Sequence, residues 1–158
     1  MNNRALGLGT AAAAFAAEWA AQPFLMAWPP GVIIPGLADF RPAWNRGVSF
    51  SLFTQDGDTG RYVLMAAIAA ISAGVVIAMW RASSRLSTVA YGLVLGGALG
   101  NLVDRVRFDG AVFDFLFLHL GTMPLFVCNL PDIVISAGVV LLFVEAFLEA
   151  RRGQTDQA

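Results

Sequence analysis

Residues 62–80 read YVLMAAIAAISAGVVIAMW, a run without a single charged side chain. An apolar run of about 20 residues is long enough to cross the roughly 30 Å hydrocarbon core of a bilayer. In lipid such a segment must be helical, because only a helix satisfies all its backbone polar groups internally. This stretch therefore predicts a transmembrane helix and places the chain among integral membrane proteins.

Three further apolar segments have the length of membrane spans or nearly so, at residues 6–28, 86–103 and 131–148. Trp28, Tyr62 and Trp80 stand at segment ends, where the membrane–water interface favours aromatic side chains. We therefore expect four transmembrane helices in a single membrane-embedded domain covering residues 1–158. The same division predicts two outer segments, 29–61 and 104–130, and a polar, disordered tail at residues 151–158.

The first segment has a second interpretation. Arg4 followed by an Ala-rich stretch is also typical of a cleaved signal peptide. Its apolar character continues past Ala21 to Trp28, which is longer than the apolar region of a signal peptide. This length favours a membrane span.

Composition agrees with a membrane protein of one domain. The 158 residues are 58% hydrophobic and 13% charged, whereas a soluble domain is about 45–50% apolar and about 25% charged. A net charge of −1 without a basic stripe argues against nucleic-acid binding. Cys128 and His119 are the only residues of their kinds, which excludes an internal disulfide framework and zinc sites made of several Cys and His.

Arginines indicate the orientation, because the chain has no lysine. Five of them lie in short segments: Arg4, Arg81, Arg85, Arg151 and Arg152. The other five are spread over the two longer segments: Arg41, Arg46, Arg61, Arg105 and Arg107. The counts are equal, but short segments dense in arginine are typical of the cytoplasmic side. We therefore expect both termini in the cytoplasm and the two longer segments on the opposite side.

The two outer segments are unusual for solvated loops. Residues 31–53 carry β-branched and aromatic side chains around the turn-forming pair Pro35-Gly36, which predicts a small β element on the outer leaflet. Residues 113–120 read FDFLFLHL, too apolar for a solvated loop and too short to span the membrane. We expect this stretch to dip into the interface or to cover a site.

Glu18 lies inside the first segment, where a carboxylate costs several kcal/mol unless it is paired, protonated or hydrated. Gln22 follows four residues later and shares its helical face. Two interpretations remain open for the pair: a polar contact between helices, or support for a polar site.

The third segment carries glycines four residues apart, at Gly92, Gly96 and Gly100, with Gly97 beside them. Small residues at this spacing predict the close approach of a neighbouring helix. The stripe ends in three polar residues on neighbouring faces: Asn101, Asp104 and Arg105. From spacing alone, Asp104 and Arg105 are either a structural ion pair or part of a site.

Two aspartates lie near the outer side. Asp132 follows Asn129, a suitable N-cap, in the first turn of the fourth segment, where the helix dipole favours negative charge. Asp114 is embedded in apolar residues, where a lone carboxylate is expensive. If the two meet, they form the carboxylate pair with which aspartic proteases activate water. Sequence spacing leaves that meeting open.

Four short blocks occur in a fixed order: NRGVSFS at residues 45–51, GGALGNLVDR at 96–105, VFDF at 112–115 and FVCNLPD at 126–132. They resemble the N-x-G-x-A-F-S, G-G-x-x-G-N-x-x-D-R, V-D-F and F-N-x-A-D blocks of the lipoprotein signal peptidases, or signal peptidase II. Each block alone is a weak match, but four in order on a chain with four spans are specific. The resemblance covers nearly the whole chain and is to bacterial membrane aspartic proteases.

The resemblance implies that Asp114 and Asp132 are the catalytic pair. It implies further roles around them: substrate contacts from Asn45, Asn101, Arg105 and Asn129, and support from Asp104, Gly47 and Glu18. The family fold has four transmembrane helices, a small periplasmic β-sheet and an interfacial periplasmic helix. The implied location is the bacterial inner (cytoplasmic) membrane, with the active site near the periplasmic face.

The implied substrate is a prolipoprotein whose lipobox cysteine carries diacylglycerol, cut just before that cysteine. Membrane lipids surround the enzyme, and the antibiotic globomycin is an expected inhibitor. No metal or organic cofactor is expected, because a carboxylate pair is sufficient to activate water.

The chain departs from the family pattern at several positions. The family usually has D-Q-x-x-K in the first span, whereas residues 18–22 read EWAAQ and replace the lysine with Gln22. Ser49 and Pro131 stand where alanines are usual, and Cys128 replaces the phenylalanine before Asn129. None of these changes removes a catalytic carboxylate. The lost lysine leaves open how Glu18 is neutralised.

Two other functions remain as alternatives. A divergent paralogue that binds lipoproteins or lipids without cutting them would explain the altered pair in the first span. A proton-coupled transporter would also use carboxylates in the membrane. The acidic residues argue against transport, because they gather on one side of the membrane rather than across it.

Overall fold

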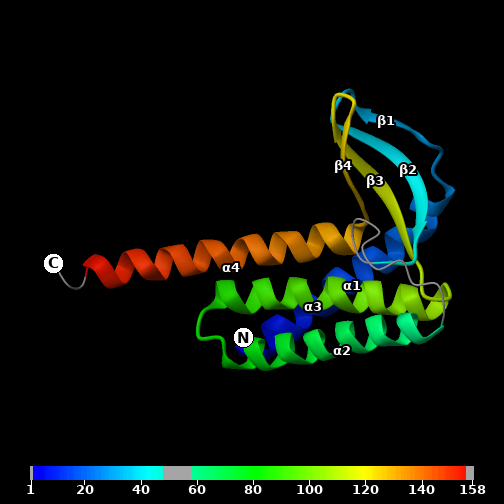
Figure 1. The fold of residues 1–158 in the computed structure, drawn as a ribbon. Coiled ribbons are helices and arrows are strands. Elements are labelled where there is room, and N and C mark those ends of the chain that lie inside the picture. Colours follow the sequence, from blue (N-terminus) through cyan, green and yellow to red (C-terminus); the bar gives the residue numbers. More distant parts are fainter. Residues whose placement is uncertain (1, 48–57, 156–158) are drawn as a thin grey trace.

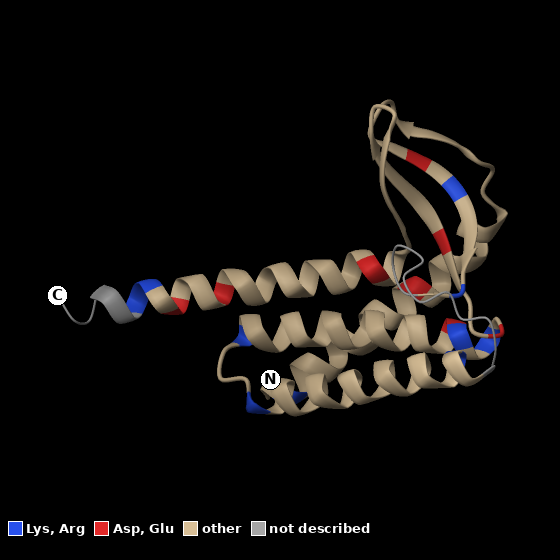
Figure 2. Cartoon of the chain, in the orientation of Figure 1, with Lys and Arg blue, Asp and Glu red and all other residues tan. Residues whose placement is uncertain are grey.

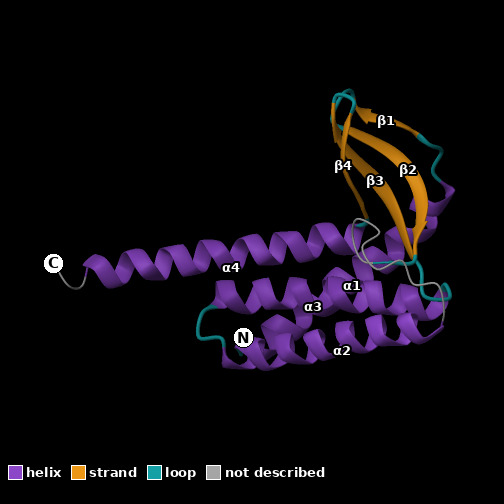
Figure 3. Ribbon diagram, viewed as in Figure 1, coloured by secondary structure: helices purple, strands orange, loops and turns teal. Residues whose placement is uncertain are grey.

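The computed structural model describes residues 2–47 and 58–155 as four helices and one sheet (Figure 1). The helices are α1 (Asn3–Ala27), α2 (Asp58–Arg81), α3 (Arg85–Arg107) and α4 (Leu130–Thr155). The strands are β1 (Gly31–Ile34), β2 (Ala38–Asn45), β3 (Val112–Leu120) and β4 (Met123–Cys128). The sheet stands at one end of the helical bundle (Figure 3).

Within the described residues, three helices are long and apolar enough to cross a membrane. They are Thr59–Arg81, Arg85–Arg107 and Leu130–Arg152, with mean hydropathies of 2.4, 1.5 and 2.2. These match three of the four predicted spans. Helix α1 is equally long but contains Glu18, Gln22 and Pro23, which lower its hydropathy.

Helix α3 is the centre of the bundle and packs against α1, α2 and α4. Its glycines make the packing close, as their spacing predicted. A Cβ added to Gly92 would lie 2.7 Å from the carbonyl oxygen of Gly7 in α1. One added to Gly97 would lie 2.6 Å from that of Pro131 in α4. Helix α3 is thereby held directly between the helices that carry Glu18 and Asp132.

The sheet is antiparallel in the order β1-β2-β3-β4. The predicted β element is confirmed for residues 31–45, with a turn at Gly36, whose φ of 76° suits glycine. Residues 48–53 of that prediction lie outside the described residues. The stretch 113–120 is strand β3, paired with both β2 and β4. Its nearly continuous apolar character hid the alternation from which strands are recognised.

An aromatic cluster joins the sheet to the helices. Phe40, Phe113 and Phe115 are buried, and partly buried Leu25 of α1 and Leu130 of α4 pack against them. Phe113 and Phe115 are two residues apart and therefore share one face of β3. This packing fixes the base of the sheet against the outer ends of α1 and α4.

The chain ends lie away from the sheet (Figure 1). Asn3 donates from Nδ2 to the carbonyl oxygen of Ser83 in the α2–α3 connection, at 3.3 Å. Charged residues sit near the helix ends, while the middle of the bundle is nearly free of them (Figure 2). Both termini and the α2–α3 connection thus share one end of the bundle, as the predicted orientation requires.

Two predictions need correction or find no support. Helix α4 continues to Thr155, so the disorder predicted for the tail is wrong for residues 151–155. Helix formers such as Leu148 and Ala150 prolong the helix, and Arg152 suits the negative end of its dipole. Residues 156–158 lie outside the described residues. The predicted interfacial helix is not among the four helices of the described chain.

Candidate active site

Asp114 lies near the start of β3, at the base of the sheet and opposite Ala43 of β2. The residue is only 2% exposed. Asn45 stands two residues beyond Ala43, on the same face of β2. Its Nδ2 donates to Asp114 Oδ2 at 2.9 Å, and the Gly47 N–H donates to Asn45 Oδ1 at 2.9 Å. The turn at Gly47 thus orients the amide that holds the Asp114 carboxylate.

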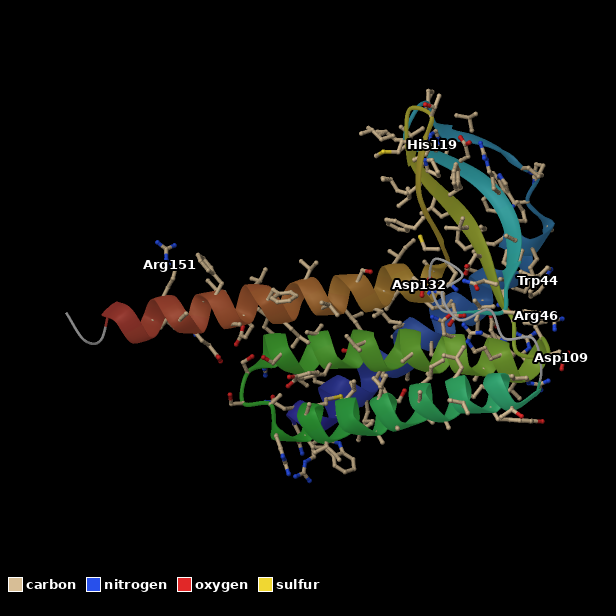
Figure 4. The ribbon with its side chains drawn as sticks, in the orientation of Figure 1. Trp44, Arg46, Asp109, His119, Asp132 and Arg151 are labelled. Atoms are coloured by element: carbon tan, nitrogen blue, oxygen red, sulfur yellow. The ribbon has the colours of Figure 1, made fainter. Side chains whose placement is uncertain are left out.

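Asp132 is positioned by the start of α4. Asn129 precedes the helix and accepts the Asp132 N–H on its Oδ1 at 2.9 Å. In return, Asp132 Oδ2 accepts the Asn129 N–H at 3.3 Å. This reciprocal pair is a capping box, so the N-cap predicted at Asn129 is confirmed. The cap holds the carboxylate at the mouth of the helix, where the base of the sheet meets the bundle (Figure 4).

Two asparagines join the two carboxylates into one cluster. Asn129 Nδ2 donates to Asp114 Oδ1 at 2.8 Å and to Asn101 Oδ1 at 3.0 Å. Asn101 Nδ2 donates to Asp132 Oδ1 at 2.9 Å. Each of the four carboxylate oxygens therefore accepts one N–H donor. The structure brings together Asp114, Asp132 and three of the predicted substrate-binding residues.

The environment of Asp114 favours a shared proton. Burial, assisted by the nearby charge of Asp132, raises the pKa of Asp114 to about 6. Hydrogen bonds from Asn45 and Asn129 and the charge of Arg105 act in the opposite direction. A carboxyl with this pKa is protonated over part of the near-neutral range, so the pair can hold a single proton there. That state is the one in which a carboxylate pair performs acid–base chemistry.

Arg105 lies beside the cluster, but it is 6% exposed and its terminal nitrogens are already occupied. Nη1 donates to the Gly110 carbonyl oxygen and Nη2 to that of Gly47, each at 2.7 Å. The residue thus ties the chain after β2 to the turn before β3. The ion pair with Asp104 that sequence spacing allowed is not among the ion pairs of the described residues.

Glu18 and Asp104 form a second pair of acids, both buried, between α1 and α3. They are 6% and 3% exposed. Gln22 donates from Nε2 to both oxygens of Asp104 at 2.7 Å. Glu18 packs against Gly100, and its buried Oε2 has no hydrogen-bond partner. Of the two interpretations for Glu18 and Gln22, the contact between helices is the one observed directly.

Two cavities flank the cluster. One of about 530 Å³ is lined by Asp132 and mainly by apolar side chains: Leu116, Leu118, Val127, Cys128, Ile133 and Ile135. The other, of about 510 Å³, is lined by Asp114 and by more polar residues that include Trp44, Asn45, Arg46 and Gly47. Phe126 and Val127 of β4 line both cavities. Each carboxylate therefore faces its own cavity, and both volumes are typical of ligand sites.

Other catalytic groups are poor candidates. Burial, together with the charges of Asp132 and Asp114, raises the pKa of Cys128 to about 11, so its thiol stays protonated at neutral pH. In the part of the chain that the structure describes, no three His, Cys, Asp or Glu side chains gather as metal ligands. The carboxylate cluster is the one arrangement described here that is suited to activating water.

Sequence reasoning missed two features of the site. Strand β4 separates the cavities, yet its sequence MPLFVC shows no clear alternation. Arg107 donates to Gln22 Oε1 at 2.8 Å and lies 3.9 Å from Asp104. Its position three residues after Asp104 on a helix was the available indication.

Comparison with known proteins identifies the family of this chain. Residues 11–148 match the family model described as signal peptidase (SPase) II. A lipoprotein signal peptidase of Methylorubrum extorquens strain PA1 is 49% identical over 122 residues, covering 77% of this chain and 71% of that one. One of Methylobacterium sp. strain 4-46 is 42% identical over 154 residues, covering 94% of this chain and 92% of that one.

The fold also matches a solved bacterial membrane enzyme, determined by the in meso method at 2.3 Å resolution. The TM-score is 0.74 at 19% identity, over 91% of this chain and 88% of that one. The family model covers most of the chain, and the two relatives are similar over most of their lengths. The chain belongs to the signal peptidase II family of membrane peptidases.

Proposed function

We propose that Asp114 and Asp132 are the catalytic carboxylates of an aspartic endopeptidase that removes signal peptides from diacylglyceryl-modified prolipoproteins. The observation that carries this proposal is the cluster in which both carboxylates are held by asparagine and backbone N–H donors. Each oxygen accepts one N–H and keeps a second lone pair for water or substrate.

In the proposed reaction the pair holds one proton. The ionised carboxylate takes a proton from water as the water oxygen attacks the scissile carbonyl carbon. The protonated carboxyl gives its proton to the carbonyl oxygen, which forms a tetrahedral diol. The diol then gives one hydroxyl proton to the ionised carboxylate and collapses, the C–N bond breaks, and the amine of the lipidated cysteine leaves with the proton of the other carboxyl. Asn45, Asn101 and Asn129 keep the two carboxylates aligned throughout.

The two cavities suit the two parts of such a substrate. The apolar cavity beside Asp132 continues onto α4, whose exposed apolar residues include Val140 and Phe143, and can take an acyl chain from the lipid phase. The cavity beside Asp114 offers polar groups and the Trp44 ring to the peptide. The lipid anchor contributes binding energy that orients the scissile bond.

We further propose that the chain is one domain with four transmembrane helices in the bacterial inner membrane. Helix α1 has 25 residues, about 37 Å of helix, and buries Glu18 and Gln22 against α3 while exposing Leu8 and Phe24. Its low hydropathy therefore comes from residues that do not face lipid. Both termini are cytoplasmic in this arrangement, and the sheet lies at the periplasmic face. Reporter fusions to the two termini test the orientation.

The decisive experiment incubates the purified protein with a synthetic diacylglyceryl prolipoprotein peptide and analyses the products by mass spectrometry. We expect one cut just before the lipidated cysteine, inhibition by globomycin, and no cut in the unlipidated peptide. Binding of the lipidated peptide without cleavage, under conditions that support a related signal peptidase, would instead identify a non-catalytic lipoprotein binder.

A further inference from the structure

Arg107 reaches from the last turn of α3 to the polar end of α1. Its Nη1 donates to Gln22 Oε1 at 2.8 Å, and its guanidinium lies over the Trp19 ring, 4.3 Å from the ring centre. Gln22 donates from its Nε2 to both oxygens of Asp104 at 2.7 Å. The direct distance from Arg107 Nη1 to Asp104 Oδ1 is 3.9 Å, which is longer than any of these hydrogen bonds. The amide of Gln22 therefore bridges Arg107 and Asp104.

Asp104 connects this arrangement to the active site. Asp104 lines the same small cavity as Phe113, the residue before Asp114 on β3, and as Asn129, which donates a hydrogen bond to Asp114. Successive side chains on a strand point to opposite faces, so the position of Phe113 sets the direction of Asp114. Small errors in the placement of a reacting group can cost up to about a hundredfold in rate.

The buried charge of Asp104 needs a cation. A buried carboxylate without a compensating charge is strongly destabilising. In the described part of the chain, Arg107 is the one cation within ion-pair distance of Asp104. Arg105, the neighbouring residue, directs its terminal nitrogens to two backbone carbonyls instead. Glu18 lines the same small cavity as Asp104, of about 10 Å³. As a second acid it supplies no positive charge.

We propose that Gln22 and Arg107 are positioning residues for the cleavage reaction. Arg107 neutralises Asp104 through the amide of Gln22, and Asp104 supports Phe113 and Asn129 across the small cavity so that Asp114 faces Asp132. We call this arrangement the Gln22–Arg107 relay. A cation placed directly at position 22 would meet Asp104 without the relay and would make Arg107 dispensable. The inference rests on the proposed function for its kinetic readout.

The test is a cycle of three variants: Arg107→Gln, Gln22→Lys and the double variant. Cleavage of the lipidated peptide gives kcat and KM, and thermal unfolding in detergent gives stability. Arg107→Gln should lower kcat by about tenfold to a hundredfold with little change in KM, because it displaces Asp114 and leaves the cavities intact. Gln22→Lys alone should keep kcat near the wild-type value. In the double variant, kcat should recover to within about threefold of wild type. The effects of the two substitutions on kcat would then be strongly non-additive.

Arg41→Gln is the matched control. Arg41 also pairs with a buried aspartate, Asp39 at 2.6 Å, and lies over an aromatic ring, Phe117 at 4.3 Å. It has no contact with the Gln22–Arg107 relay. Its replacement should leave kcat unchanged, which shows that loss of a partly exposed arginine is not enough to slow cleavage.

Two results would overturn the proposal: a kcat for Arg107→Gln within twofold of wild type, or a double variant as slow as Arg107→Gln. If Arg107→Gln does not fold, the double variant must fold and cleave, and its failure also overturns the relay. If wild type cleaves nothing, the proposed function is wrong. The unfolding temperatures of the same proteins then still test the relay. Arg107→Gln should have a lower unfolding temperature than wild type, and the double variant should regain the wild-type value.

Discussion

Two pairs of acids lie around the outer end of α3, and they differ in what surrounds them. Asp114, Glu18 and Asp104 are buried, whereas Asp132 is partly buried. Asp114 and Asp132 accept four N–H bonds from asparagine side chains and backbone, and each faces a cavity of more than 500 Å³. Glu18 and Asp104 share a space of about 10 Å³, roughly the room for one water. One oxygen of Glu18 has no partner.

The contrast teaches that buried carboxylates alone do not identify a catalytic site. Each pair contains at least one fully buried carboxylate, and both lie near the outer end of α3. What separates them is room for a substrate and a set of neutral donors that leaves the charge available for proton transfer. We propose that the pair without room for a substrate serves the structure, whereas the pair with room carries out the proposed cleavage. The predictions below test this division.

The largest effect should come from Asp114→Asn and Asp132→Asn. Each substitution keeps the shape of the side chain but removes a group that can take or give a proton. We expect each to lower the cleavage rate by at least about a hundredfold without unfolding the protein. Cleavage assays with unfolding curves in detergent measure both properties. A folded variant that cleaves near the wild-type rate would show that the carboxylate pair is wrongly assigned.

Arg105→Lys should give the next largest effect. A guanidinium reaches Gly47 and Gly110 at once, whereas an ammonium on a flexible stem cannot reproduce that planar geometry. The loss of one hydrogen bond from a charged group costs about 1.5–3 kcal/mol, so we expect cleavage and globomycin binding to weaken about tenfold or more. Arg85→Lys, at the opposite end of α3, is the control. Unchanged affinity and rate would remove Arg105 from the site.

Asn45→Ala should change the pH dependence more than the fold. The Asn45 hydrogen bond favours ionised Asp114, so its loss raises the pKa of Asp114 above the present value of about 6. The singly protonated pair then persists to higher pH, and the alkaline limb of the pH–rate profile should move to higher pH. A profile of kcat/KM against pH measures this shift. A limb that stays in place or moves to lower pH would contradict the role given to Asn45.

Glu18→Gln should have the smallest effect on cleavage. Glu18 makes no hydrogen bond to Asp114 or Asp132, the proposed catalytic pair, in the described structure, so activity should remain within about twofold of wild type. The change should appear mainly in the unfolding temperature, because it alters a buried ionisable group beside Gly100. If a stable, globomycin-binding Glu18→Gln protein loses all turnover, the division between the two acid pairs fails.

Local patterns predicted much of this protein. The apolar runs predicted the three helices that can span a membrane, and Pro35-Gly36 predicted the β1–β2 turn. The glycine stripe predicted close packing of α3, and Asn129 its role as a helix cap. These features depend on residues within a few positions of one another. Strand β3 was missed because its residues are nearly all apolar and show no alternation of apolar and polar side chains along the chain.

The sequence by itself determined that this is a membrane protein with a few asparagines and aspartates at the ends of its spans, because composition and spacing are local properties. Only the tertiary structure decided which of those groups meet. Asn45 and Asp114 are 69 residues apart, and Gln22 and Asp104 are 82 apart. Their contacts depend on how closely the glycines of α3 let α1 and α4 approach. That packing sums weak interactions over many residues, and spacing along the chain carries no record of it.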